Sequence, residues 1–198
     1  MEAAHPSVAN RRDGLSWPRW ILLALLGWWT LRLGTGLASW CFLDLVNLAF
    51  HEAGHLFFTP FGSTVHYLGG TLGQLIVPGG LAIYFVFRQH QPLGAAFCCW
   101  WFGESLINIS IYMADARSLA LPLVGGGDHD WNELFFRFGL LGESSVSRVS
   151  SVVHALGVLF MLIGMAWVLY FALPAIRRQR IFESLSWRWP WMAPLLDD

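Results

Sequence analysis

Long apolar runs, separated by short polar or glycine-containing breaks, make up most of this chain of 198 residues. A membrane-spanning helix needs about 20 largely apolar residues, and five segments approach that length: 18–34, 37–59, 67–88, 93–116 and 147–174. The first two are separated only by "RLGTG", which is either a tight turn or a bend in one longer helix. The pattern therefore predicts an all-α fold, a polytopic membrane bundle of about five transmembrane helices, with four as the alternative.

The less apolar parts of the chain lie outside these runs. Residues 117–146 form the one sizeable loop, and residues 175–198 form a tail rich in arginine and tryptophan. We expect 1–198 to be a single integral-membrane domain, with the helical bundle over 18–174, the loop close to the functional site and the tail at the membrane interface. The density of glycine and proline in 67–88 predicts a kinked or interrupted helix there.

Composition strengthens the membrane interpretation. Only 13% of the residues are charged, against roughly 25% in an ordinary soluble domain. Many of the twelve tryptophans flank apolar runs, which is typical of side chains at a membrane–water interface. The net charge of −1 gives no reason to expect a nucleic-acid partner. A multi-pass protein that has the lipid bilayer as its main partner is the expected class.

One of the most apolar stretches contains the sequence HEAGH at residues 51–55. On a helix, residues four apart share a face, so His51 and His55 can direct two imidazole nitrogens at one point. This is the zincin pattern, in which two histidines bind zinc and Glu52 is the general base for a zinc-activated water. Ionisable groups inside a membrane span are energetically costly and are usually functional. Zn²⁺ is therefore the predicted cofactor, and two histidines satisfied by core hydrogen bonds are the alternative.

Two polar stripes follow helical spacing in otherwise apolar segments. The first stripe consists of Asp44, Asn47, His51 and His55, and the second consists of Glu104, Asn108, Tyr112 and Asp115. Because each segment is otherwise apolar, we expect both stripes to turn towards the bundle interior and to face one another across the metal. Interhelical hydrogen bonding without any chemistry is the alternative for the second stripe.

A catalytic zinc site usually has three protein ligands and one open position. The segment "GGGDHDW" follows the fourth predicted helix, and two crossings separate it from HEAGH, so both lie on the same side of the membrane. His129 is the first choice for the third ligand and Asp130 is the second, with the other one orienting a ligand imidazole. Glu104 is a further alternative, because a glutamate on a later helix completes many HExxH sites. A solvated loop with acidic turn residues is the remaining interpretation.

These features resemble the site-2 protease family of intramembrane zinc metalloproteases. The resemblance covers about half of the chain: His51, Glu52 and His55 in an apolar helix, a glycine-rich segment after them and a later acidic loop. It implies hydrolysis of a peptide bond within or beside the bilayer. In that family the third ligand is an aspartate in an Asn-Pro-Asp-Gly or Leu-Asp-Gly sequence. Neither sequence occurs here, and "GGGDHDW" corresponds to them only by position.

The leading hypothesis is a membrane-embedded zinc metallohydrolase, an intramembrane peptidase whose substrate is a membrane peptide. The first alternative is a non-catalytic metal-binding membrane subunit or chaperone-like binder, which would have a closed site with four ligands. The second is a zinc-dependent lipid hydrolase. It would have a lateral opening wide enough for acyl chains and lined by Trp100, Trp101 and Phe102.

Overall fold

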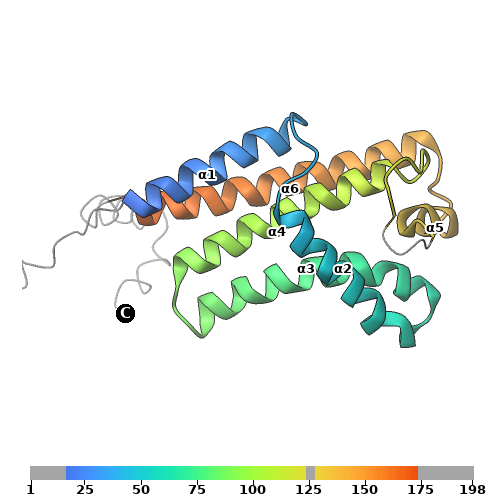
Figure 1. Ribbon diagram of the computed structural model, residues 1–198, viewed down its shortest axis with the longest axis horizontal. Coiled ribbons are helices and arrows are strands. Elements are labelled where there is room, and N and C mark those ends of the chain that lie inside the picture. The colour runs from blue at the N-terminus through green and yellow to red at the C-terminus, as the bar shows by residue number, and fades with distance from the viewer. Residues whose placement is uncertain (1–16, 124–127, 174–198) are drawn as a thin grey trace, which may run out of the picture.

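The computed structural model describes residues 17–123 and 128–173, and every regular element in these residues is helical (Figure 1). The elements in chain order are α1 (Trp17–Gly34), α2 (Leu43–Phe58), the short 3₁₀ helix η2 (Thr59–Phe61), α3 (Ser63–Phe87), α4 (Pro92–Ala114), α5 (Asp130–Arg137) and α6 (Glu143–Ala172). The predicted all-α class is therefore confirmed for these residues. The predicted interfacial tail lies outside the described residues.

The chain turns between α1 and α2, so the break between the first two predicted segments is not a bend in one helix. The backbone of Gly36 has a φ of 73°, in the left-handed region that favours glycine. At the start of α2 the Cys41 N–H donates a hydrogen bond of 2.6 Å to the Asp44 carboxylate. α2 has 16 residues and is about 24 Å long at the usual helical rise. It is therefore shorter than the predicted segment 37–59.

α3 runs without interruption through its glycines and contains Pro78 within the helix. Gly69 and Gly73 of α3 lie against Gly54 of α2, and a methyl group added to any of the three would overlap backbone atoms of the other helix. Small residues allow two helix backbones to approach closely. Of the predicted kinked or interrupted helix over 67–88, the interruption is absent, because α3 is continuous there. The glycines Gly69 and Gly73 serve a helix–helix contact instead.

The helices pack in the spatial order α1, α6, α4, α3 and α2, with each helix against the next (Figure 1). The main buried cluster includes Leu26 of α1, Trp100 of α4 and Met161 of α6. α2 crosses α3 obliquely, and its contact with α4 is much smaller than its contact with α3. α5 lies at the end of the bundle, against α3 and α4. Residues of α2, α3, α4 and the start of α5 line a common cavity at this end of the bundle.

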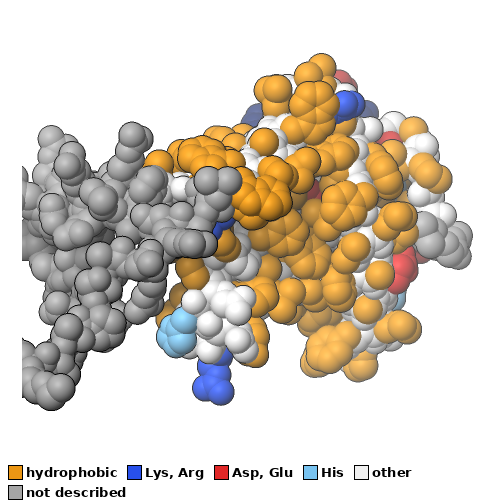
Figure 2. All heavy atoms as spheres, turned by 60° about the vertical axis from the view of Figure 1, so that its left-hand side comes forward, with side chains coloured by type: hydrophobic (Ala, Val, Ile, Leu, Met, Phe, Trp, Pro, Cys, Tyr) orange, Lys and Arg blue, Asp and Glu red, His pale blue; other side chains and the backbone are white. Residues whose placement is uncertain are grey.

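The outer faces of the helices are apolar. Figure 2 shows a face on which hydrophobic side chains cover most of the described surface. Large side chains that are exposed include Trp28, Leu31, Leu45, Phe57, Ile83 and Leu162. Two of the described helices, α3 and α6, are long and apolar enough to cross a membrane, by length and composition.

Candidate metal centre

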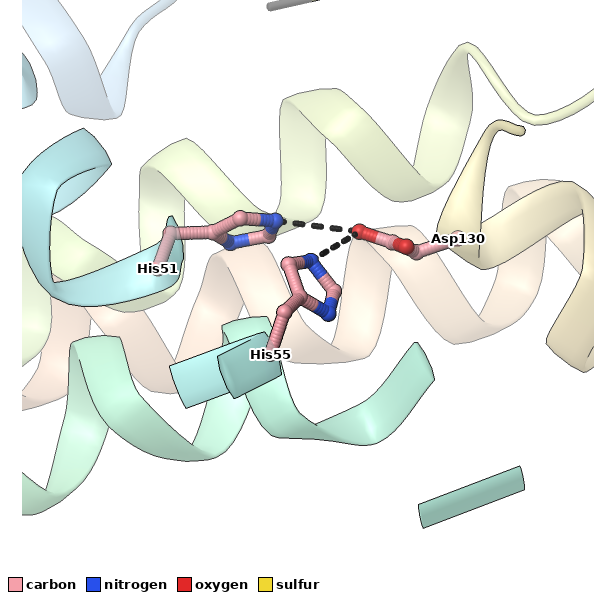
Figure 3. A group of neighbouring side chains, drawn as sticks. All are labelled: His51, His55 and Asp130. Atoms are coloured by element: carbon pink, nitrogen blue, oxygen red, sulfur yellow. Dashed lines mark hydrogen bonds and ion pairs between the residues drawn. The ribbon is translucent and has the colours of Figure 1, made fainter. Parts of the chain in front are cut away.

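His51 and His55 lie on the face of α2 that is turned towards α5, and Asp130 at the start of α5 points back at them (Figure 3). The Asp130 Oδ2 atom is 3.0 Å from His51 Nε2 and 3.2 Å from His55 Nε2. One ligand atom from each of the three residues lies within 4.8 Å of the other two. The three side chains are mostly buried, with exposed fractions of 13%, 15% and 7%. This group could hold a metal ion.

The ring of His55 is oriented by a main-chain group of α3. Its Nδ1 atom is 2.8 Å from the carbonyl oxygen of His66, which can only accept a hydrogen bond. Nδ1 therefore donates to this carbonyl, and Nε2 is the nitrogen that is directed at Asp130. Histidines that bind metals usually have the other ring nitrogen fixed by such a contact.

The position of His51 depends on a glycine of α3. A Cβ atom added at Gly70 would lie 2.5 Å from His51 Cε1 and closer still to Nε2. Only a residue without a side chain leaves room for the imidazole there. By contrast, a Cβ atom at Gly80, on the same helix, meets nothing within 4 Å.

We expect Gly70→Ala to displace the His51 ring and to lower the affinity for zinc. The loss should be about 10–100-fold, the range seen when a group that orients a metal ligand is removed. The measurement is a zinc competition titration with a chromophoric chelator, and Gly80→Ala is the matched control. Wild-type affinity in Gly70→Ala would contradict this account of His51.

The start of α5 is fixed to the end of α4. The Asp130 N–H donates to the hydroxyl oxygen of Tyr112 at 3.2 Å, and the Asn132 side chain donates to the carbonyl of Ala116 at 2.6 Å. Both partners lie on or directly after α4. These two contacts with the end of α4 hold the start of α5 in place, with the Asp130 side chain directed at α2. Sequence reasoning expected the loop and HEAGH to meet at this end of the bundle, and the contact from Asp130 to both histidines confirms that they do.

The structure brings Asp130, and not His129, to the histidine pair. His129 is the N-cap residue of α5, and its Nδ1 atom accepts a hydrogen bond of 3.2 Å from the Asn132 N–H. Its Nε2 atom faces Asp115 Oδ2 at 3.5 Å. Both ring nitrogens are thus directed at neighbours within the α4–α5 connection. The first choice for the third ligand moves from His129 to Asp130 for this reason.

The protonation states of Asp130 and His129 are consistent with their roles as metal ligand and helix cap. Burial by itself raises the pKa of the Asp130 carboxyl, but hydrogen bonds from His51 and His55 outweigh burial and leave this pKa below its usual range. Burial lowers the pKa of His129, although the nearby Asp115 opposes the shift. At neutral pH, Asp130 is therefore an anionic ligand, and His129 is a neutral imidazole whose Nδ1 lone pair caps α5.

Glu104 lies in a separate network between α2 and α4. It accepts a hydrogen bond from the Asn47 side chain at 2.9 Å and lies 3.3 Å from the Cys41 thiol. The Asn108 side chain donates to Asp44 at 2.8 Å. The two polar stripes therefore face one another, as predicted. At Glu104 and Asn108 they do so through direct interhelical hydrogen bonds, which was the alternative, and not across the metal group. Cys41, Asp44 and Glu104 also place ligand atoms within 4.8 Å of one another, but Glu104 is not brought to the histidines of HEAGH.

Glu52 lines a cavity together with the three residues of the metal group. The cavity has a volume of about 710 Å³, within the range of small-molecule and substrate sites. The glutamate is exposed to this cavity and is not drawn into the group of ligand atoms. Other lining residues combine polar and apolar side chains: Asp44, Gln74, Asn108, Leu45, Leu48 and Leu121. The arrangement can bind a metal, admit a substrate and offer a carboxylate to it.

Two residues of this site were missed by sequence reasoning. Gly70 belongs to a run that was interpreted only as a helix breaker, although small residues four apart in α3, Gly69 and Gly73, indicate a close helix contact. His66 acts through its main-chain carbonyl. No pattern of side chains reveals such a contact.

Comparison of this chain with protein-family models, with curated protein sequences and with solved structures finds no match in any of the three. The site is therefore interpreted from its own residues. The resemblance to site-2 proteases stays a hypothesis that rests on His51, Glu52 and His55.

Proposed function

We propose that this protein is a membrane-embedded zinc metallohydrolase that cleaves a peptide bond within or beside the bilayer. The observation that carries the proposal is the convergence of His51, His55 and Asp130 at the wall of a cavity that Glu52 also lines. A nucleic-acid partner is no part of this proposal. The substrate is a membrane peptide.

The donor set fits zinc. Two imidazole nitrogens and one carboxylate are common ligands of catalytic zinc sites, and such sites leave a fourth position open. A bound zinc ion would lower the pKa of a coordinated water and polarise a carbonyl group. Within the described residues the group has three members and borders the cavity. An open position supports a hydrolase over a structural metal site with four protein ligands.

Glu52 supplies the proton transfers of the proposed reaction. It takes a proton from the attacking water as the water oxygen bonds to the carbonyl carbon of the substrate. When the carbon–nitrogen bond breaks, Glu52 gives that proton to the departing amine. Asp130 and the two histidines keep their places throughout, because His66, Gly70 and the start of α5 hold them.

A peptide is favoured over a lipid substrate. The lipid hypothesis expected an opening lined by Trp100, Trp101 and Phe102. Trp100 and Trp101 are buried in the core, with exposed fractions of 2% and 7%, and the Phe102 ring packs against Phe160. The cavity at HEAGH does not include these residues. This part of the surface therefore offers no acyl-chain entry.

We further propose that the bundle is a multi-pass membrane protein of about five spans. The apolar outer faces support this, as do the lengths of α3 and α6. α4 lies between them and has 23 residues. The number of spans is four if α2, with its 16 residues, enters the bilayer without crossing it.

The test is cleavage of a panel of co-expressed single-span membrane peptides that carry a different tag at each end. We expect cleavage by the wild-type protein in isolated membranes, loss of cleavage after a zinc chelator, and recovery with about one equivalent of added zinc, because the site has one set of three ligands. Magnesium should not restore activity, since it prefers oxygen ligands. A zinc-loaded protein that cleaves none of the peptides would favour the non-catalytic metal-binding subunit.

A further inference from the structure

Tyr112 lies beside the start of α5, and its ring is held in place by two histidines. The ring centroid is 4.1 Å from that of His129 and 6.0 Å from that of His51, which it meets edge to face. The Tyr112 hydroxyl oxygen accepts the Asp130 N–H at 3.2 Å. The phenol therefore lies beside the metal group with little freedom to move.

The hydroxyl proton of Tyr112 has no acceptor within the described part of the chain. A phenol can donate one hydrogen bond and can also accept, and here only the accepting side is used. Tyr67, which lines the same cavity, differs because its hydroxyl donates to Asp128 at 3.0 Å. Tyr112 also lines the cavity. Its O–H group is therefore free to donate to a molecule bound there.

We propose that Tyr112 is a further catalytic residue, which donates a hydrogen bond to the substrate carbonyl oxygen as that oxygen becomes negative. The inference rests on the proposed peptidase function. In that reaction Glu52 handles the proton of the attacking water, and negative charge builds up on the carbonyl oxygen. A donor that is already in position stabilises this charge without any rearrangement. The contacts of Tyr112 with Asp130, His129 and His51 provide that fixed position.

The experiment compares Tyr112→Phe with Tyr84→Phe in the full chain. The first substitution keeps the aromatic ring and removes only the hydroxyl. Tyr84 is an exposed residue of α3 whose hydroxyl accepts a hydrogen bond from Gln89, and it does not line the cavity. We expect Tyr112→Phe to lower kcat about 10²–10³-fold, as for the loss of other oxyanion donors, with KM and zinc content little changed. Tyr84→Phe should keep wild-type kcat.

A second measurement does not depend on turnover. The protein is loaded with Co²⁺, and its visible absorption is titrated with a phosphinic peptide that has leucine on both sides of the phosphinic group. This group carries the tetrahedral shape and the negative oxygens of the transition state. The wild-type protein should bind it more tightly than Tyr112→Phe does, by about the same 10²–10³-fold.

Three results would overturn the inference. Full kcat in zinc-loaded Tyr112→Phe would show that the hydroxyl is not used. Loss of zinc from this variant would make Tyr112 a positioning residue for Asp130. Equal affinity of both proteins for the phosphinic peptide would show that no hydrogen bond is made to the charged oxygen. If the wild-type protein cleaves no peptide, the proposed function fails, and the cobalt titration still decides whether Tyr112 binds such a group.

Discussion

Glu52→Gln is expected to remove nearly all turnover and to leave zinc bound. Glutamine keeps the size of the side chain but cannot accept the proton of the attacking water. General-base catalysis contributes about 10²–10⁴-fold in rate, so kcat should fall by that factor. Metal content should not change, because Glu52 is not one of the three grouped ligands, His51, His55 and Asp130.

The measurement is cleavage of the tagged membrane peptides, with zinc determined on the same preparations. Glu143→Gln is the matched control. Its carboxylate is highly exposed at the start of α6 and pairs with Arg117 at 3.1 Å, away from the cavity. This control should retain wild-type rates. Undiminished turnover in Glu52→Gln would rule out the role given to Glu52.

Asp130→Ala should lower the affinity for zinc by more than about 100-fold. It removes a metal ligand, and this loss should exceed the loss of about 10–100-fold expected when only a group that orients a ligand is removed. His129→Ala should keep the metal. It removes the N-cap of α5 and is expected to cost about 1 kcal/mol of stability. Asp128→Ala is the control for loss of a nearby carboxylate, since Asp128 pairs with Tyr67 and is not part of the metal group.

Zinc per chain and the midpoint of thermal unfolding are measured for the three variants. The two readouts separate the roles, because His129→Ala should lower the midpoint and Asp130→Ala should lower the zinc content. The opposite pattern, with zinc lost in His129→Ala and kept in Asp130→Ala, would restore His129 as the third ligand.

Helical periodicity and the order of the helices along the chain predict much of the arrangement of the site. The spacing of His51 and His55 places them on one helix face, and counting crossings places the segment after the fourth helix at the same end of the bundle. The stripe containing Asp44 and Asn47 also finds its partners on α4, as helical spacing predicts. These relations depend on helix geometry alone.

The choice between His129 and Asp130 could not be made in this way, because it depends on the residue at which α5 begins. Adjacent residues at a helix start point in different directions, so a shift of one residue exchanges cap and ligand. A signal for α5 was present. Acidic residues occur in its first turn and Arg137 in its last, around the buried pair Leu134 and Phe135. The prediction of a loop over 117–146 is therefore wrong for Asp130–Arg137, which form α5.

Other differences have equally local causes. The density of glycine and proline in α3 predicted a kinked or interrupted helix, but the helix is continuous, and Gly69 and Gly73 make a close contact with α2. Glu104 was a reasonable ligand from its place on a later helix. It contacts Asn47 and Cys41 instead, and which residues it meets depends on the position of α2 relative to α4 along the helix axes. Helical spacing fixes which face a residue occupies and leaves the relative height of two helices open.

The most direct test of the central claim is zinc K-edge X-ray absorption on the purified wild-type protein with one equivalent of zinc at neutral pH. His51, His55 and Asp130 predict two imidazoles and a carboxylate, with nitrogen and oxygen scatterers at about 2.0–2.2 Å and no sulfur at about 2.3 Å. A sulfur scatterer would place the metal at the buried group of Cys41, Asp44 and Glu104 instead. That result, or a protein that retains no zinc, would contradict the account.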